Sequence, residues 1–331
     1  GCAGEGGAHP PEPTVDPTVE PTEEQLAAQR RAMLGRGSSD LPDHPLARHL
    51  TGLVQVVSQD TVVKVVADML KKSVQSSNMP PFSYRSRCIL AFKRLPMTGD
   101  EMIIFGMFVR EFGPDSPTPN RGRVHIESID STALYGGEVA EQRQHSLTAI
   151  IGGYLDYSRC HGFEYAHLRV PPPTDAHAHI FARRTLPVRL KAAVHVSTWF
   201  HRILRGSVTC GISRDYNSGH QLNPAQFPVS LLSARDLSTE ETFQHLLETN
   251  SVSMPPVDRF FVAKLQPANL AAPFVEDPAP LILCPAVSNR RAFVELITSH
   301  ELLFHTSSFG AISTMIIIKS VLDHVEVIAN K

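Results

Sequence analysis

The sequence predicts a single α/β domain with a mixed central β-sheet, flanked by helices and long loops. In residues 123–155 the apolar pattern changes from a period of two to a helical period, as in a strand followed by a helix. Elsewhere strand-like and helix-like segments mix without a regular β-α-β repeat, and no internal repeat appears. The 331 residues, 42% of them hydrophobic, suffice for one large domain with a sizeable core.

The first 45 residues predict a disordered tail. They are rich in Pro, Glu and Gly and poor in aromatic residues. Such a segment cannot bury enough apolar surface to offset the entropy lost on ordering. The folded domain is therefore expected at residues 46–331.

Three segments before residue 122 have strand-like composition. The β-branched cluster Val62–Val66 is compatible with a strand or with a buried helix. Arg87–Lys93 and Met102–Val109 are predicted as neighbouring strands joined through a turn at Thr98–Asp100. Because Met102–Val109 is apolar on both faces, we expect it in the centre of the sheet.

A strand and a helix are predicted next. Val124 and Ile126 alternate with polar residues, which indicates a strand with one buried face. The helix is indicated by one apolar stripe: Leu147, Ile150, Ile151, Tyr154 and Leu155. Gly162 stands where a C-terminal cap would end it. Arg143 lies one turn before the stripe, near the helix start, where an arginine suits a phosphate. The alternative is a solvated arginine on an ordinary amphipathic helix.

The second half of the chain is less regular. Tyr165–Val170 alternates as a strand does and ends at three prolines. Residues 174–198 lack strong periodicity and are expected to form a long loop that ends on a short helix with Trp199. The later elements are predicted as strands at Arg259–Leu265 and Leu281–Cys284 and helices at Arg291–Thr298 and Phe309–Val321.

Composition excludes several classes of protein. A formal net charge of −2 argues against a nucleic-acid binder. The five cysteines show no CxxC pairing, and their odd number fits a reducing compartment. The sixteen histidines form no tight metal-binding motif, so no metal is expected. No apolar run reaches ~18 residues, so we expect no membrane span and a soluble, intracellular protein.

Six runs in the same order resemble the CREB-binding-protein type of histone acetyltransferase domain. They are FSYRSRCILAF (82–92), EMIIFGMFVREFGPDSPTPNRGRV (101–124), SIDS (128–131), GGYLDYSRCHGFEYAHLRVPPP (152–173), WFHRIL (199–204) and EDPAPLILC (276–284). The similarity covers roughly 60–325, apart from a poorly matched insertion or loop region at 205–250. The resemblance implies an acetyltransferase-like fold, acetyl-CoA as cosubstrate and histone tails or other lysine-bearing proteins as acceptors. It also implies a nuclear protein of chromatin and transcription regulation, with transcription factors as further partners.

By this resemblance, three segments hold the cofactor. They are the turn Ile129, Asp130 and Ser131, the helix start Arg143 and Gln144, and the later residues Leu190, His195 and Trp199. Gln144 replaces a threonine of the family, and His195 replaces an arginine. An ungapped count from Ser131 would place the phosphate-binding arginine on Glu141, whereas a count back from GGYLDY places it on Arg143. A carboxylate would repel a phosphate, so we favour Arg143. Without the resemblance, a lone tryptophan such as Trp199 is more often a core residue.

The expected catalytic positions differ from those of the family. Phe200 stands where the family has the tyrosine that protonates the departing thiolate, and it has no proton to give. Arg169 and His179 replace a tryptophan and a tyrosine of the lysine channel. Two hypotheses remain open. The chain is a working lysine acetyltransferase in which water or His179 supplies the proton, or it is a degenerate domain that binds acyl-CoA or proteins.

Overall fold

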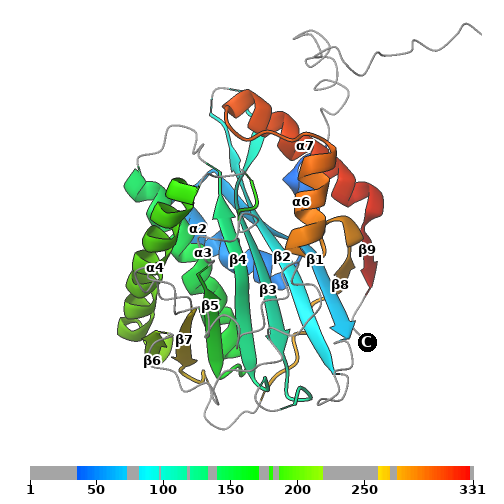
Figure 1. Ribbon diagram of the computed structural model, residues 1–331. Coiled ribbons are helices and arrows are strands. Elements are labelled where there is room, and N and C mark those ends of the chain that lie inside the picture. Colours follow the sequence, from blue (N-terminus) through cyan, green and yellow to red (C-terminus); the bar gives the residue numbers. More distant parts are fainter. Residues whose placement is uncertain are drawn as a thin grey trace, which may run out of the picture. The chain divides into compact units, whose positions relative to one another are not determined.

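The described part of the chain forms a nine-stranded mixed sheet in the order β6-β7-β5-β4-β3-β2-β1-β8-β9 (Figure 1). The computed structural model describes residues 36–72, 82–96, 98–117, 120–132, 140–170, 179–181, 186–218, 260–268 and 274–328. All of them belong to one compact unit that begins at Arg36. The predicted α/β class with a mixed central sheet is confirmed.

The centre of the sheet consists of three long antiparallel strands: β1 (Thr61–Lys72), β2 (Ser83–Arg94) and β3 (Glu101–Phe112). The segment Val62–Val66, for which a strand or a helix was expected, is part of β1. The predicted pairing of the next two strands is confirmed, and both are buried over almost their whole length. This follows from their composition, because a strand that is apolar on both faces needs cover on both sides.

Next to β3 the chain makes a parallel crossover. β4 (Arg123–Ser131) pairs with β3 in antiparallel fashion and with β5 (Tyr165–Arg169) in parallel fashion, and α3 (Ala140–Cys160) connects the two. The predicted apolar stripe of α3 is buried against the sheet. The helix ends as expected, because Gly162 adopts a φ of +85°, which glycine tolerates without strain.

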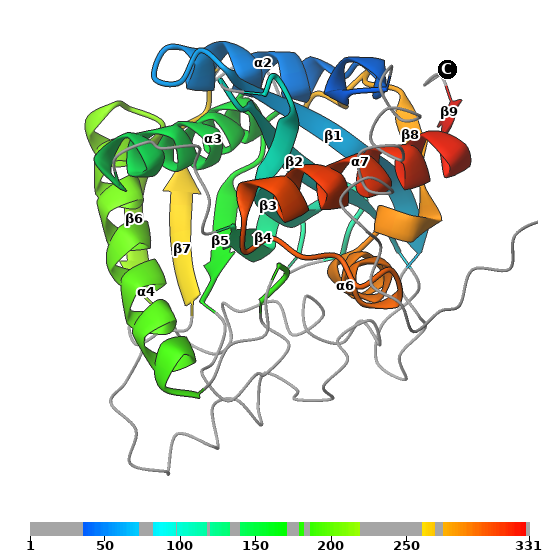
Figure 2. The same cartoon turned by 90° about the horizontal axis from the view of Figure 1, so that it is seen from above.

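Helices cover both faces of the sheet (Figure 2). Helices α2 (Pro45–Gln55), α3 and α4 (Leu186–Thr209) pack on one face, and α6 (Arg290–Ser299) and α7 (Ser307–His324) pack on the other. Alternation along the strands separates two cores, since Ile89 belongs to the first and its neighbours Cys88 and Leu90 to the second. None of the described helices is long and apolar enough to cross a membrane.

The remaining strands complete the two edges of the sheet. They are β6 (Ser213–Ser218) and β7 (Phe260–Leu265) at one edge and β8 (Leu281–Leu283) and β9 (Glu326–Ile328) at the other. The predicted late strands and the last two predicted helices agree with β7, β8, α6 and α7 within a few residues.

Two expectations need correction. Residues 36–45 were assigned to the tail, but they carry a 3₁₀ turn, η1 (Ser38–Asp40), and the buried side chains of Leu41 and His44. The domain therefore begins about ten residues earlier, and residues 1–35 lie outside the described part. The long loop at 174–198 is also wrong from residue 186 onward, where α4 begins. The segment lacks strong periodicity, which hid this helix, and its single proline, Pro187, is tolerated in a first turn.

Candidate functional site

The candidate site begins where β4 ends and α3 starts. Ser131 is the last residue of β4, and α3 begins nine residues later, so its first turns lie beside that strand end. Arg143 Nη2 donates a hydrogen bond to Ser131 Oγ at 2.8 Å. Glu141, which an ungapped count from Ser131 would place at the phosphate, is exposed. The geometry thus places a guanidinium at the junction of the predicted turn and the predicted helix start.

Helix α4 adds a third segment to this region. Trp199 Nε1 donates to Thr148 Oγ1 at 3.1 Å, and Arg202 Nη1 donates to Gln144 Oε1 at 2.6 Å. Both acceptors belong to the first half of α3. The end of β4, the start of α3 and the Trp199 turn of α4 therefore lie together. Ile129, Asp130 and Ser131 were predicted as a turn, but they are the last residues of the strand. Because the Gln144 oxygen already accepts a hydrogen bond, its amide nitrogen is the group that would donate to a ligand.

The other two predicted residues of α4 lie nearer the start of this helix than Trp199 does. His195 is exposed and precedes Trp199 by one turn, on the same helix face. Leu190 is in the first two turns of α4, and its side chain lies outside the described part. At ~1.5 Å of rise per residue, Leu190 lies ~14 Å from Trp199 along the axis. The two would therefore contact different parts of an extended ligand.

Asp130 serves a purpose that the sequence did not reveal. Its Oδ2 accepts the backbone N–H groups of Ile180 at 2.8 Å and Phe181 at 3.0 Å, and its Oδ1 accepts the N–H of Ser131 at 2.8 Å. The carboxylate thereby fastens residues 179–181 to the end of β4. His179 therefore lies beside Asp130, with its Nδ1 4.0 Å from Asp130 Oδ1.

The three expected catalytic positions lie on three different segments of the chain. Arg169 is the last residue of β5 and lies near Glu127. Burial alone would raise the pKa of Glu127, but the guanidinium groups of Arg110 and, after it, Arg169 outweigh burial and lower that pKa. The Glu127 carboxylate is therefore held ionised among cations, and the β4–β5 surface here is rich in positive charge.

Phe200 is a core residue in this structure. It is fully buried, stacks on Trp199 with ring centroids 5.9 Å apart, and meets Phe261 edge-on at 6.0 Å. Such aromatic contacts fix the orientation of the neighbouring Trp199. Phe200 therefore supports the site by packing and has no group that transfers a proton.

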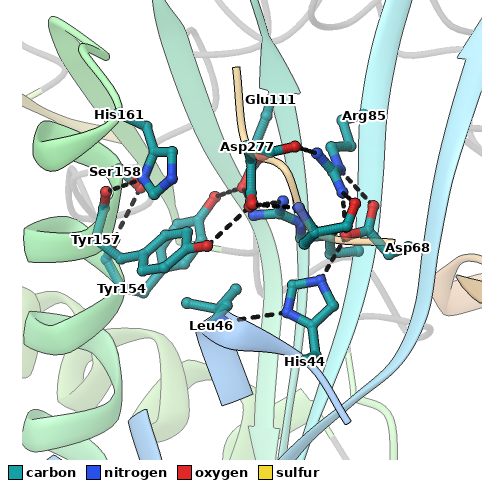
Figure 3. Close-up of polar contacts among 12 residues, drawn as sticks. His44, Leu46, Asp68, Arg85, Glu111, Tyr154, Tyr157, Ser158, His161 and Asp277 are labelled. Carbon is teal, nitrogen blue, oxygen red and sulfur yellow. Dashed lines mark hydrogen bonds and ion pairs between the residues drawn. The ribbon is translucent and has the colours of Figure 1, made fainter. Parts of the chain in front are cut away.

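Sequence reasoning missed a buried ionic network at the other end of α3 and β3 (Figure 3). At its centre, Arg87 donates to Asp68 at 2.9 Å, to Glu111 at 2.7 Å and to Asp277. Arg85 binds Asp68 through two nitrogens, at 2.6 and 2.9 Å. In the sequence, the only sign of this network was the pair Arg85 and Arg87, two charged residues with one residue between them in a predominantly apolar segment. None of the predicted site residues belongs to this network.

Electrostatics explain how the network tolerates burial. Burial would raise the pKa of Asp68, but Arg87, His44 and Arg85 together lower it below the ordinary value. Burial would likewise lower the pKa of Arg87, but its carboxylate partners raise it. Asp68 and Arg87 therefore remain charged because they are buried together. Among the described residues, no group of histidine, cysteine and carboxylate side chains has the arrangement of a metal site.

A family model and several known proteins match this chain. A model of the KAT3 histone acetyltransferase domain matches residues 49–241. Protein cbp-1 of Caenorhabditis elegans is 30% identical over 154 residues, which are 46% of this chain and 7% of that protein. Histone acetyltransferase HAC1 of Arabidopsis thaliana is 27% identical over 195 residues, which are 57% of this chain and 11% of that protein. The chain thus spans only a small part of the length of these relatives.

A solved structure shows a more distant likeness. Rtt109 from Aspergillus fumigatus aligns with 86% of this chain and 98% of its own, with a TM-score of 0.42 and 9% identity. A likeness at this level supports no conclusion about the site.

Proposed function

Since the matched residues 49–241 make up more than half of its length, the chain belongs to the KAT3 histone acetyltransferase domain family, and we propose that it is a lysine acetyltransferase. It would transfer the acetyl group of acetyl-CoA to lysine side chains of histone tails or other proteins. Nuclear localisation, a role in chromatin and transcription regulation, and transcription-factor partners belong to the same proposal. Curated relatives titled histone acetyltransferases support it.

The observation that carries the proposal is the contact between Arg143 and Ser131. The guanidinium has a neutral hydroxyl as a neighbour at 2.8 Å, close to a helix start. A phosphate is a stronger partner than a hydroxyl, because it adds an opposite charge and can accept two parallel N–H groups of the guanidinium. Arg143 and the amide nitrogen of Gln144 would therefore hold phosphate, and Trp199 would wall the acyl-carrying arm.

Acetyl transfer also needs proton movement. The acceptor amine must lose a proton, and the thiol that leaves the thioester must gain one. Phe200 can do neither. His179 is the titratable group on the segment that Asp130 fastens, 4.0 Å from that carboxylate. We assign His179, or a water held beside it, as the proton carrier, and Asp130 as the residue that positions it.

A second function fits the departures from the family. Arg169 places a cation at the strand end where an acceptor lysine would pass, and like charges repel strongly in a dry channel. With Phe200 buried, these features favour a domain that binds acyl-CoA or proteins without turnover.

An acetyl-transfer assay separates the two functions. The purified chain is mixed with acetyl-CoA and a histone-tail peptide, and free thiol and acetylated peptide are measured together. If the chain is an acetyltransferase, free thiol and acetylated peptide should form in equal amounts. Both products should be lost in Arg143→Glu and kept in Arg205→Glu, which reverses an exposed charge on α4. Wild-type binding of acetyl-CoA without acetylated peptide would instead favour the binding module.

A further inference from the structure

A cavity lies at the end of the molecule opposite the proposed acetyl-transfer site. It has a volume of about 370 Å³ and is formed by the start of β2, the end of β3, the end of α3 and residues 274–277. Ser131 pairs with Phe105 on β3, and Glu111 of the cavity lies six residues farther along that strand. At ~3.3 Å per residue, the two sites are ~20 Å apart. No residue assigned to acetyl transfer lines the cavity.

Aromatic rings form much of its wall. Tyr84, Tyr157, Phe163 and Phe274 all line it. Phe163 and Phe274 meet edge-on at 5.1 Å, and Tyr157 lies against His161 with ring centroids 4.2 Å apart. His161 Nδ1 donates to the backbone carbonyl of Tyr157 at 2.9 Å, which holds the His161 ring in place. Fixed rings suit an alkyl stem that carries a cation, because the ring face attracts positive charge.

Part of the ionic network forms the floor of the cavity. The two guanidinium groups of Arg85 and Arg87 are engaged by three carboxylates: Asp68, Glu111 and Asp277. Tyr154 and Tyr157 donate hydroxyl hydrogen bonds to Glu111 at 3.0 Å and to Asp277 at 2.9 Å. Of these groups, Arg85 and Arg87 line the cavity together with Glu111 and Asp277, so the floor is balanced in formal charge and its arginines are committed to the protein.

Two further carboxylates lie at the exposed side. Asp115 and Glu276 both line the cavity and are exposed to solvent. Within the described ranges, neither forms an ion pair. Arg121 donates from Nε to the Ser116 carbonyl at 3.3 Å but is not a lining residue. The cavity thus has an acidic mouth, aromatic walls and a floor whose charges are balanced.

We propose that this cavity binds an arginine or lysine side chain of a basic protein segment. The alkyl stem packs between the rings, and the cationic head pairs with Asp115 and Glu276. This volume lies near the lower end of the range of ligand sites, ~300–1,000 Å³, which suits one long side chain and a few waters. The proposal does not depend on acetyl transfer, because the two sites share no residue.

Binding of a charged peptide and its neutral twin tests the proposal. The probe is a fluorescein-labelled glycine-rich peptide with two arginines, and the twin carries citrulline, which keeps the shape and removes the charge. We expect the arginine peptide to bind the full chain at least about tenfold more tightly than the citrulline peptide. The double variant Asp115→Asn, Glu276→Gln should abolish most of this preference. Both positions are exposed, so thermal unfolding should match that of the wild type.

Two controls make the outcome decisive. Asp60→Asn with Glu326→Gln removes two exposed carboxylates that do not line the cavity, and it should bind as the wild type does. Arg143→Glu changes the acetyl-transfer site and should also leave peptide affinity unchanged. Equal losses in the two carboxylate pairs would mean non-specific attraction and would overturn the proposal. So would equal binding of the arginine and citrulline peptides.

Discussion

At the scale of single residues, the position of Arg143 could be chosen from the sequence, whereas the contacts of the Asp130 carboxylate could not. Arg143 could be chosen over Glu141 from sequence, because only a cation suits a phosphate at a helix start. Asp130 was predicted only as a cofactor contact. Its hydrogen bonds to Ile180 and Phe181 span 50 and 51 residues, and no local pattern encodes a partner so far away. The roles of both residues in cofactor binding stay predictions.

Asp130→Asn tests the fastening of residues 179–181. The amide oxygen keeps one acceptor but loses the charge that strengthens the hydrogen bonds to Ile180 and Phe181. We expect a loss of about 1.5–3 kcal/mol in unfolding free energy. We also expect faster amide hydrogen exchange at both N–H groups.

The control for this change is Asp43→Asn. Asp43 pairs with Arg48 on the surface, where its side chain is 70% exposed, so the change should cost less than about 1 kcal/mol. If the exchange of Ile180 and Phe181 stays slow in Asp130→Asn, the carboxylate does not fasten this segment.

At the scale of elements, α3 was predictable and α4 was not. The apolar stripe of α3 has one clear period, whereas the segment that contains the first half of α4 lacks strong periodicity. The pairing of β2 with β3 could be predicted from the turn at Thr98–Asp100 that joins them. The parallel pairing of β4 with β5 and the insertion of β7 between β5 and β6 depend on contacts that periodicity does not report.

Two adjacent glycines of α3 test how α2 packs on it. A Cβ on Gly153 would meet Leu53 Cδ1 at 2.6 Å and Leu50 Cδ2 at 2.9 Å, whereas a Cβ on Gly152 would meet nothing within 4 Å. Gly152→Ala should therefore stabilise the protein by up to about 1 kcal/mol through helix propensity. Gly153→Ala should be less stable than Gly152→Ala by about 1–3 kcal/mol, because α2 must shift.

Urea unfolding of both variants measures this difference. Gly152→Ala is the matched control, since the substitution and the helix are the same. Equal stabilities of the two variants would show that α2 does not lie against α3 at Gly153.

At the scale of the whole molecule, the ionic network joins elements that are far apart in sequence. Arg87 and Asp277 are 190 residues apart, and His44 of the N-terminal region bonds to Asp68 at 2.9 Å. Removing one partner from such a set leaves a buried charge without compensation, which typically costs ~3–5 kcal/mol. Charged residues within an apolar strand pattern can be recognised in the sequence, but the residues that pair with them cannot.

The pKa shifts predict that acid destabilises the fold in two steps. Burial lowers the pKa of His125 from 6.5 to about 3 and that of His167 well below 6.5, so both are neutral when folded. Unfolding then takes up protons below about pH 6.5, and stability should fall from there. The lowered pKa values of Asp68 and Asp277 add a second loss once the pH falls below about 4. Glu111, whose pKa burial raises, works in the opposite direction.

Urea unfolding between about pH 7.5 and about pH 5 isolates the first step. The double variant His125→Gln, His167→Gln should flatten the decline, while His305→Gln with His324→Gln, at exposed positions, should leave it unchanged. An unchanged slope in the buried pair would mean that these two histidines do not set the pH response.

The most direct test of the central claim is the affinity of coenzyme A for the wild type and for Arg143→Glu, measured by calorimetry. The same titrations with coenzyme A that lacks the ribose phosphate complete a double-mutant cycle. If Arg143 holds that phosphate, the variant should bind intact coenzyme A at least about tenfold more weakly, which is about 1.4 kcal/mol. The two proteins should then differ little toward the truncated cofactor. Equal affinities of both proteins for intact coenzyme A would contradict the assignment of this strand end and helix start as the cofactor site.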